Sequence, residues 1–377
     1  MSGDTQVIEN EVELLCVGNA IVDIFARDES GLALRYALCE PVQHVEIEKL
    51  KSLLPALCEI ATVSGGGAAN AAKIAGLLGA KVVFRGAIGS DHFGRFFEEA
   101  LKSAGVKTRL VEKRSPTGLC LVLQTEGGTV IAASPSAALE FSESDIGEDD
   151  FKKTKVVVID GFMLGRRGLV LRLLELAAQH GTAVAIDLGS PAIAADEAWK
   201  IAAYVASRIA LNAALGDTPP DTSHNMRRHP FFLFMNEDEA VAFHNSLDRS
   251  LDPSFNRGLA VDFEQTLPFF KAFSAGELAE RGRPIIVVKL GKRGAVCFAD
   301  GKSFHAATEA VEPVETTGAG DAFCGAFLAA WARGRDLSEC AAIGNRAARI
   351  VLGGAGTKVE KNAFKDLALL LEGNRNL

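Results

Sequence analysis

The segment Glu315–Asp321, with the sequence ETTGAGD, could bind an anion at the start of a helix. The apolar run Ala322–Leu328 predicts that helix, whose N-terminus carries open N–H groups and about half a positive charge, which favours a phosphoryl group. Asp321 could then accept the proton of an attacking hydroxyl. The main-chain amides that could stabilise the transferring group are those of Gly318, Ala319 and Gly320. The alternative is an ordinary helix start in which Asp321 caps the first turn.

A second glycine-rich segment, Ser64–Asn70, precedes the predicted helix Ala68–Leu78. Its consecutive glycines would let a ligand approach the main chain closely, and Asn70 offers a donor and an acceptor together. The G-x-G-x-x-N spacing also resembles a dinucleotide-binding fingerprint, which normally ends in Gly or Ala and has an acidic residue about 20 positions further on. Arg85 stands at the end of the following predicted strand. That basic residue disfavours NAD and leaves an NADP-linked oxidoreductase as an alternative.

The elements that would position these segments alternate between short apolar runs and helical patterns. Apolar runs without polar alternation indicate strands buried on both faces, as in a parallel sheet between helices. Repeated units of this kind predict a doubly wound α/β domain. The predicted strands are Val12–Val17, Val82–Phe84, Val156–Asp160, Ala183–Leu188, Phe231–Phe234 and Ile285–Leu290. The predicted helices are Ala68–Leu78, Phe93–Ala104, Leu169–His180 and Thr266–Glu280.

Other segments break this alternation. Leu119–Gln124 and Thr129–Ala133 flank a glycine turn and predict a β-hairpin. Together with Ala26–Glu59, this hairpin could form a small sheet that covers the main one. A second hairpin is predicted for Gly294–Ala299 and Lys302–Ala306, with an Asp-Gly turn. Two polar segments that contain proline are expected to be surface loops, namely Gly216–Pro230 and Asn245–Gly258.

Composition excludes several classes of protein. The chain has 377 residues, of which 48% are hydrophobic and 23% charged, enough for a large globular core. A net charge of −8 without a long basic run argues against nucleic-acid binding, and no stretch of about 18 apolar residues indicates a membrane span. The seven cysteines form no CxxC pair, and the seven histidines show no metal-ligand spacing, so neither a disulfide framework nor a zinc site is expected. With no export signal at the polar N-terminus, a cytoplasmic protein is expected.

The order of the motifs resembles that of the PfkB family of ribokinase-like kinases, which includes ribokinase, fructokinase and adenosine kinase. The matching stretches run from about residue 12 to about residue 356. They are Gly18–Asp23, Gly65–Ala72 with Gly79, Gly86–Gly94, Asn236–Glu239, and Thr317–Asp321 with Gly325 and Ala326. The resemblance implies one ribokinase-like domain over residues 1–377: a doubly wound, mostly parallel sheet with helices on both faces and a small β lid from about 26–59 and 119–133.

The resemblance also implies roles for individual residues. Asp321 would be the general base, beside an anion hole formed by Gly318, Ala319 and Gly320. The residues that would hold substrate hydroxyls are Asp23, Gly65, Gly66 and Asn70. Glu239 would hold Mg²⁺ through water, a placement that suits a hard cation that keeps its hydration shell. The residues placed at the nucleotide and its phosphates are Asn236, Glu239, Lys289, Gly291, Gly294 and Asn345; for Asn345 a helix-capping role is the alternative.

The implied activity is ATP- and Mg²⁺-dependent phosphorylation of a hydroxymethyl group of a sugar or nucleoside. The alternatives are an adenosine kinase-like nucleoside kinase and a catalytically silent sugar-binding relative. Glu315 stands where relatives usually carry Asp, and the loop 353–356 is unusually rich in glycine, so activation by K⁺ is not expected. The connections 212–230 and 245–263 are longer than is usual in the family. Three phenylalanines could form aromatic walls for a base or belong to the core, namely Phe25, Phe141 and Phe162. A homodimer could form through the lid.

Overall fold

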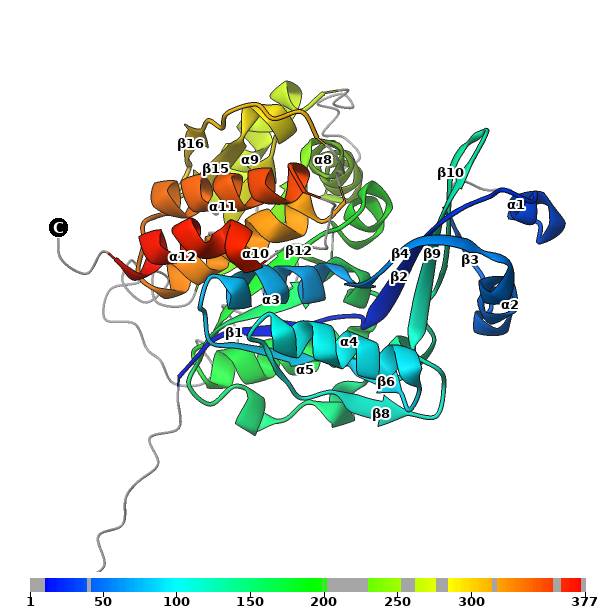
Figure 1. The fold of residues 1–377 in the computed structure, drawn as a ribbon. Coiled ribbons are helices and arrows are strands. Elements are labelled where there is room, and N and C mark those ends of the chain that lie inside the picture. Colours follow the sequence, from blue (N-terminus) through cyan, green and yellow to red (C-terminus); the bar gives the residue numbers. More distant parts are fainter. Residues whose placement is uncertain are drawn as a thin grey trace, which may run out of the picture.

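The computed structural model describes residues 11–38, 42–198, 200–201, 230–251, 262–275, 284–313, 317–354 and 361–373. Within these residues the strands form a sheet of nine strands, one of five and one of two (Figure 1). We call the first the main sheet and the second the small sheet. The two-stranded sheet pairs β6 (Ala87–Gly89) with β8 (Val111–Lys113).

The main sheet is parallel over most of its width. In spatial order, the strands β7, β5, β1, β11, β12, β13 and β14 are all parallel to one another. At the opposite edge, β15 and β16 form an antiparallel hairpin. This confirms the second predicted hairpin. In spatial order the strands are β16 (Lys302–Ala306), β15 (Ala295–Ala299), β14 (Ile285–Lys289), β13 (Phe231–Asn236), β12 (Ala183–Asp187), β11 (Thr154–Asp160), β1 (Val12–Val17), β5 (Val82–Arg85) and β7 (Lys107–Thr108).

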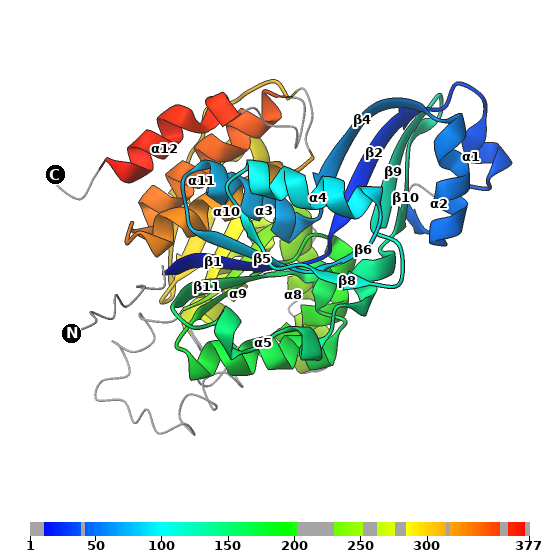
Figure 2. The ribbon, with the colours of Figure 1, turned by 60° about the horizontal axis from the view of Figure 1, so that its bottom comes forward.

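Helices cover both faces of the main sheet (Figure 2). Leu14 and Cys16 of β1 pack towards α3, α4, α10, α11 and α12, whereas Leu15 and Val17 pack towards α5, α8 and α9. All four side chains are fully buried, as expected for a strand without polar alternation. The helices are α3 (Gly67–Leu77), α4 (His92–Ser103), α5 (Arg167–Gln179), α8 (Glu237–Leu251), α9 (Leu267–Ala275), α10 (Ala319–Ala332), α11 (Leu337–Leu352) and α12 (Lys365–Glu372).

The small sheet projects from one end of the main sheet, with α1 (Leu32–Arg35) and α2 (Ile47–Leu53) beside it (Figures 1 and 2). It contains the predicted hairpin, now β9 and β10, and strands from the segment 26–59. Two of its strands extend beyond those bounds towards the main sheet, because β2 begins at Ile21 and β4 continues to Gly65. In spatial order its strands are β3 (Val42–His44), β10 (Gly128–Ser134), β9 (Gly118–Thr125), β2 (Ile21–Arg27) and β4 (Cys58–Gly65).

One predicted loop is partly helical. The loop prediction for Asn245–Gly258 is wrong up to Leu251, where α8 ends. Ala240, Phe243 and Leu247 recur at helical spacing on α8 and are buried, so packing extends the helix through a polar stretch. The remainder of the 245–263 connection up to residue 261, most of 212–230 and the end of the predicted helix 266–280 lie outside the described residues. No helix in the described ranges is both long and apolar enough to cross a bilayer.

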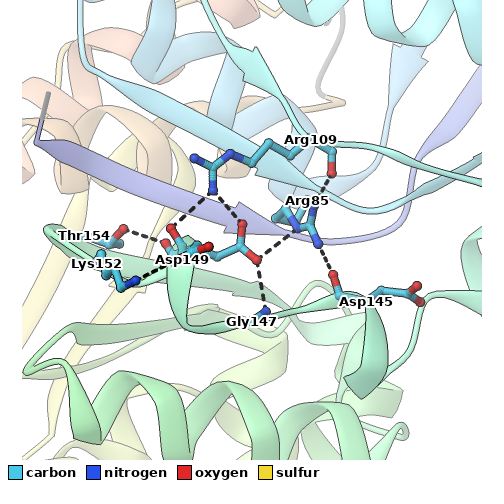
Figure 3. A network of polar contacts seen from close by, with 8 residues as sticks. Arg85, Arg109, Asp145, Gly147, Asp149, Lys152 and Thr154 are labelled. Atoms are coloured by element: carbon cyan, nitrogen blue, oxygen red, sulfur yellow. Dashed lines mark hydrogen bonds and ion pairs between the residues drawn. The ribbon is translucent and has the colours of Figure 1, made fainter. Parts of the chain in front are cut away.

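A network of charged side chains ties the edge of the main sheet to the 3₁₀ turns Glu143–Asp145 and Glu148–Asp150 (Figure 3). Arg85 of β5 donates hydrogen bonds to the main-chain oxygens of Arg109, at 2.7 Å, and Asp145. Its Nε also lies 3.4 Å from a carboxylate oxygen of Asp150, whose other oxygen accepts a 2.9 Å bond from Arg109. The network therefore holds the chain that leads into β11, the strand that ends at Asp160.

Candidate active site

The two glycine-rich segments predicted from the sequence begin two helices, α3 and α10, that pack against each other. The contact is close: a Cβ at Gly325 would collide with the main-chain oxygen of Ala71. This packing brings Asn70 to Asp321, and the side-chain amide of Asn70 donates a 2.8 Å hydrogen bond to Asp321 Oδ2. The structure therefore joins two predicted site residues that belong to separate sequence motifs.

The N-terminus of α10 has the features of an anion site. Gly318 precedes the helix with φ 81°, a left-handed conformation that favours glycine. The N–H of Ala322 donates to the oxygen of Gly318 at 2.9 Å, so the N–H groups of Ala319, Gly320 and Asp321 come before the helical ladder. The N-cap residue itself, Gly318, provides no side-chain cap. These donors and the helix dipole point to an anionic ligand.

Asp321 lies in an environment that disfavours its charge. Burial raises the pKa of its carboxyl to about 7; the negative charges of Asp187 and Asp160 also raise it, while the hydrogen bond from Asn70 and the charge of Lys289 lower it. A general base works best when its pKa lies near the operating pH. A carboxyl whose pKa is raised in this way could serve as a general base, which is the role predicted for Asp321.

Charged residues end three of the parallel strands of the main sheet. Asp160 ends β11, Asp187 ends β12 and Lys289 ends β14. Lys289 Nζ lies 2.7 and 3.0 Å from the Asp187 carboxylate oxygens and 3.2 Å from the place that a Cβ on Gly320 would occupy. Burial lowers the pKa of Lys289, but Asp187 and Glu239 raise it by more, so the ammonium stays charged. Asp160 and Asp187 were not predicted as site residues from the sequence, although an acidic residue that ends a buried strand is a usable signal.

Asn236 and Glu239 form a reciprocal cap at the start of α8. The main-chain N–H of Asn236 donates to Glu239 Oε2 and that of Glu239 donates to Asn236 Oδ1, both at 2.8 Å. This is a capping-box arrangement, which holds the buried carboxylate in place. Burial raises the pKa of Glu239, while the charge of Lys289 lowers it and that of Asp187 raises it. The described residues contain no group of three His, Cys, Asp or Glu side chains that could hold a metal ion.

The expected acceptor residues lie where the small sheet meets α3. Asp23 of β2 faces β4, and its carboxylate occupies the space that a Cβ at Gly65 would need. Gly66 has φ 95° and lies against the main-chain oxygen of Asn19, so it too must lack a Cβ. Burial raises the pKa of Asp23 to about 7, while Lys73 and a hydrogen bond with Cys120 lower it. The buried Asn70 Oδ1 has no hydrogen-bond partner within the described residues. A cavity of about 550 Å³ adjoins this position, lined in part by Ser64, Asn70, Lys73 and Gly318.

The other residues expected at the nucleotide are Gly291, Gly294 and Asn345. Gly291 and Gly294 form the turn after β14, and Gly294 lies against the oxygen of Ala306 at the end of β16. Asn345 of α11 donates to the same oxygen at 2.9 Å. The three residues therefore lie close together, around the end of β16 and the turn after β14. Their contacts with a nucleotide stay a prediction. Glu315, which bears on activation by K⁺, lies outside the described residues.

Comparison with known proteins identifies the family. The pfkB family carbohydrate kinase profile matches residues 42–212 and 198–362. The chain belongs to the pfkB family of carbohydrate kinases. It is therefore a kinase, as expected from its motifs, and the NADP-linked alternative is wrong. A dinucleotide fingerprint follows a strand of the parallel sheet, whereas β4 lies in the small sheet, antiparallel to β2, and Arg85 is engaged in the ion network.

The relatives of this pfkB kinase include sugar and nucleoside kinases. It is 24% identical over 317 residues to a 5-dehydro-2-deoxygluconokinase of Clostridium botulinum, with 80% of this chain and 82% of that protein covered. It is 25% identical over 354 residues to an adenosine kinase of Schizophyllum commune, with 90% and 94% covered. Its structure resembles that of a probable sugar kinase from Rhizobium etli, with TM-score 0.74, 23% identity and coverage of 95% and 99%. This likeness confirms the predicted ribokinase-like fold.

Proposed function

We propose that the protein transfers the γ-phosphoryl group of ATP to a hydroxymethyl group of a sugar or nucleoside, with Asp321 as the general base. The contact between Asn70 and Asp321 at the open N-terminus of α10 carries this proposal. Asn70 uses its amide hydrogen to orient the base, and its unpartnered Oδ1 is free to accept a hydroxyl hydrogen of the acceptor. One pair of residues thus binds and activates a polyhydroxylated molecule.

The donor set around Asp321 suits a polyphosphate accompanied by a divalent cation. The main-chain amides of Gly318, Ala319 and Gly320, with Lys289 beside them, supply positive charge for the phosphates. Asp187 and Glu239 supply carboxylates that can hold water molecules of a hydrated Mg²⁺. When bound, Mg²⁺ would neutralise charge on the phosphates of ATP. Asp321 takes the proton of the acceptor hydroxyl as its oxygen attacks in line, and the amides stabilise the charge that develops on the transferred group.

The small sheet would act as the lid of this site. It carries Asp23 and Gly65, so its position decides whether the acceptor hydroxyls meet their partners. Closure over the acceptor would exclude water and limit hydrolysis of ATP.

We also infer a cytoplasmic location, because the six described cysteines are free and four of them are buried, as in a reducing compartment. A homodimer through the small sheet stays a prediction.

A nucleoside acceptor is the more specific candidate. Of the three phenylalanines considered as walls for a base, Phe141 is buried in the core, Phe25 is partly buried, and Phe162 is 52% exposed. The main-chain N–H of Phe162 donates to Asp160 Oδ1 at the end of β11, and its ring lies 3.0 Å from the place that a Cβ on Gly189, shortly after β12, would occupy. An exposed aromatic ring beside a polar site can stack on a base. Adenosine kinase among the relatives is consistent with this choice.

The test is ADP release from ATP and Mg²⁺ in the presence of single sugars and nucleosides. The proposal predicts release above the rate with water for at least one acceptor, together with a phosphorylated product detected by mass spectrometry. Faster release with nucleosides than with sugars would favour the nucleoside. Binding of an acceptor by calorimetry without any ADP release would instead identify a catalytically silent relative and refute the proposed activity.

A further inference from the structure

Lys73 is a buried lysine on α3 that none of the proposed roles uses. It stands in a row of alanines, and its side chain is 8% exposed. Its ammonium donates to the main-chain oxygen of Ser64 at 2.6 Å and to Ser64 Oγ at 3.0 Å. Both acceptors are neutral, so they do not offset the cost of burying a charge. The negative charges that favour the charged form of Lys73 are those of Asp23 and Asp321.

The position of Lys73 links the two halves of the site. Its partner Ser64 immediately precedes Gly65, the glycine against which the Asp23 carboxylate lies. Lys73 also lines the cavity next to Asn70 and Ser64. A methionine would fill the same space between alanines without burying a charge, so packing alone does not explain a lysine here.

We propose, on the basis of the phosphotransfer function above, that Lys73 is a positioning residue that favours the ionised form of the Asp23 carboxyl and fixes Ser64 at the edge of the acceptor site. A carboxylate can accept hydrogen bonds from two neighbouring hydroxyls of a sugar or ribose, whereas a protonated carboxyl must donate one of them. Lys73 thereby sets the preference of the site for acceptors with adjacent hydroxyl groups.

The charges around Asp23 are consistent with this role. Asp23 faces Lys73 from α3 and the thiol of Cys120 from β9, and Lys73 in turn faces Asp321 from α10. Burial raises the pKa of Asp23 to about 7, and Lys73 is the charge that opposes this rise. Burial lowers the pKa of Lys73 to about 8, so the ammonium is mostly charged at neutral pH. Removal of that charge would leave Asp23 mostly protonated at pH 7.

The test compares K73Q, which keeps a donor for Ser64 without the charge, with K73R, which keeps the charge. Titration of the Asp23 carboxyl is followed by NMR with ¹³C-labelled aspartate, and D23N assigns the signal. In K73Q the Asp23 midpoint should rise by about one pH unit or more, while in K73R it should stay close to that of the wild type. An unchanged midpoint in K73Q would overturn the inference. This readout does not need catalysis, so it decides the role of Lys73 even if no acceptor releases ADP and the proposed function fails.

Kinetics with an active acceptor provide a second readout. In K73Q the KM for the acceptor should rise several-fold at pH 7 and approach the wild-type value at pH 9, where Asp23 ionises without help. The KM for ATP should not change. A merely structural lysine would raise the acceptor KM equally at both pH values, and that result would also overturn the inference. If K73Q does not fold, as judged by circular dichroism, K73M takes its place in both measurements, since methionine matches the unbranched stem.

Discussion

Asn70 Nδ2 lies 2.8 Å from Asp321 Oδ2, although 251 positions separate the two residues along the chain. One residue comes from the first turn of α3 and the other from the first turn of α10. Both helices begin beside the carboxyl ends of the parallel strands of the main sheet, so their N-terminal ends meet there. The hydrogen bond orients the carboxylate that we propose as the base, so acceptor binding and proton transfer depend on one contact.

Replacement of Asp321 by asparagine should separate binding from turnover. The amide matches the carboxylate in size and can still bond with Asn70, but it cannot accept a proton. We expect D321N to lower kcat by roughly 10²–10⁴-fold, the usual contribution of a positioned base, with little change in the KM of the acceptor. Steady-state ADP release measures both constants. A kcat close to that of the wild type would remove Asp321 from the proposed role.

The pH dependence of kcat should report the ionisation of Asp321. The pKa of this carboxyl is raised to about 7, mainly by burial, and only the ionised form can act as a base. Turnover should therefore fall as the pH decreases through about 7, instead of staying level down to about pH 4 as for an ordinary aspartate. A rate profile from pH 5 to 9 at saturating acceptor and ATP measures this limb. The residual activity of D321N should lack it, and the same limb in D321N would assign it to another group.

The sequence predicts the strands and the two glycine-rich motifs, but not how the site is assembled. Strand bounds such as those of β1 follow from apolar runs, because burial on both faces leaves little room for polar residues. The contact of Asn70 with Asp321 depends on the order of strands in the sheet, which local patterns do not contain. Lys73 was missed for a related reason, since a lysine in a helix is usually exposed and only the packing of α3 shows that this one is buried. Asn245 shows the opposite error, because its polar surroundings predict a loop although α8 continues to Leu251.

Lys289 should contribute positive charge to the site that binds the phosphates of ATP. Its ammonium lies beside Gly320 and is held by Asp187. We expect K289M to raise the KM for ATP and to lower kcat by at least about tenfold, because hydrogen bonds to charged groups contribute roughly 1.5–3 kcal/mol. Lys292, an exposed lysine in the following turn, provides the control. K292M should keep both constants near wild-type values, and equal effects of the two substitutions would argue against a specific role for Lys289.

Asp150 should stabilise the edge of the main sheet through the network of Figure 3. Its side chain is 8% exposed, and its two oxygens face Arg109, Arg85 and the main-chain N–H of Gly147. D150N keeps the size of the side chain but removes the carboxylate charge that the guanidinium groups of Arg85 and Arg109 both face. We expect a loss of about 1–3 kcal/mol in the free energy of unfolding, measured by urea denaturation.

Asp149 is the matched control for Asp150, since it is the neighbouring residue and is 84% exposed. It pairs with Lys152 at the surface, where solvent screens the interaction, so D149N should leave the urea midpoint unchanged. The network lies at the edge of the sheet and does not include Asp321 or Asn70, so D150N should retain the wild-type KM values at temperatures where it is folded. Equal midpoints for the two variants would show that the network does not stabilise the fold. A raised acceptor KM in folded D150N would show that the chain leading into β11 also positions the active site.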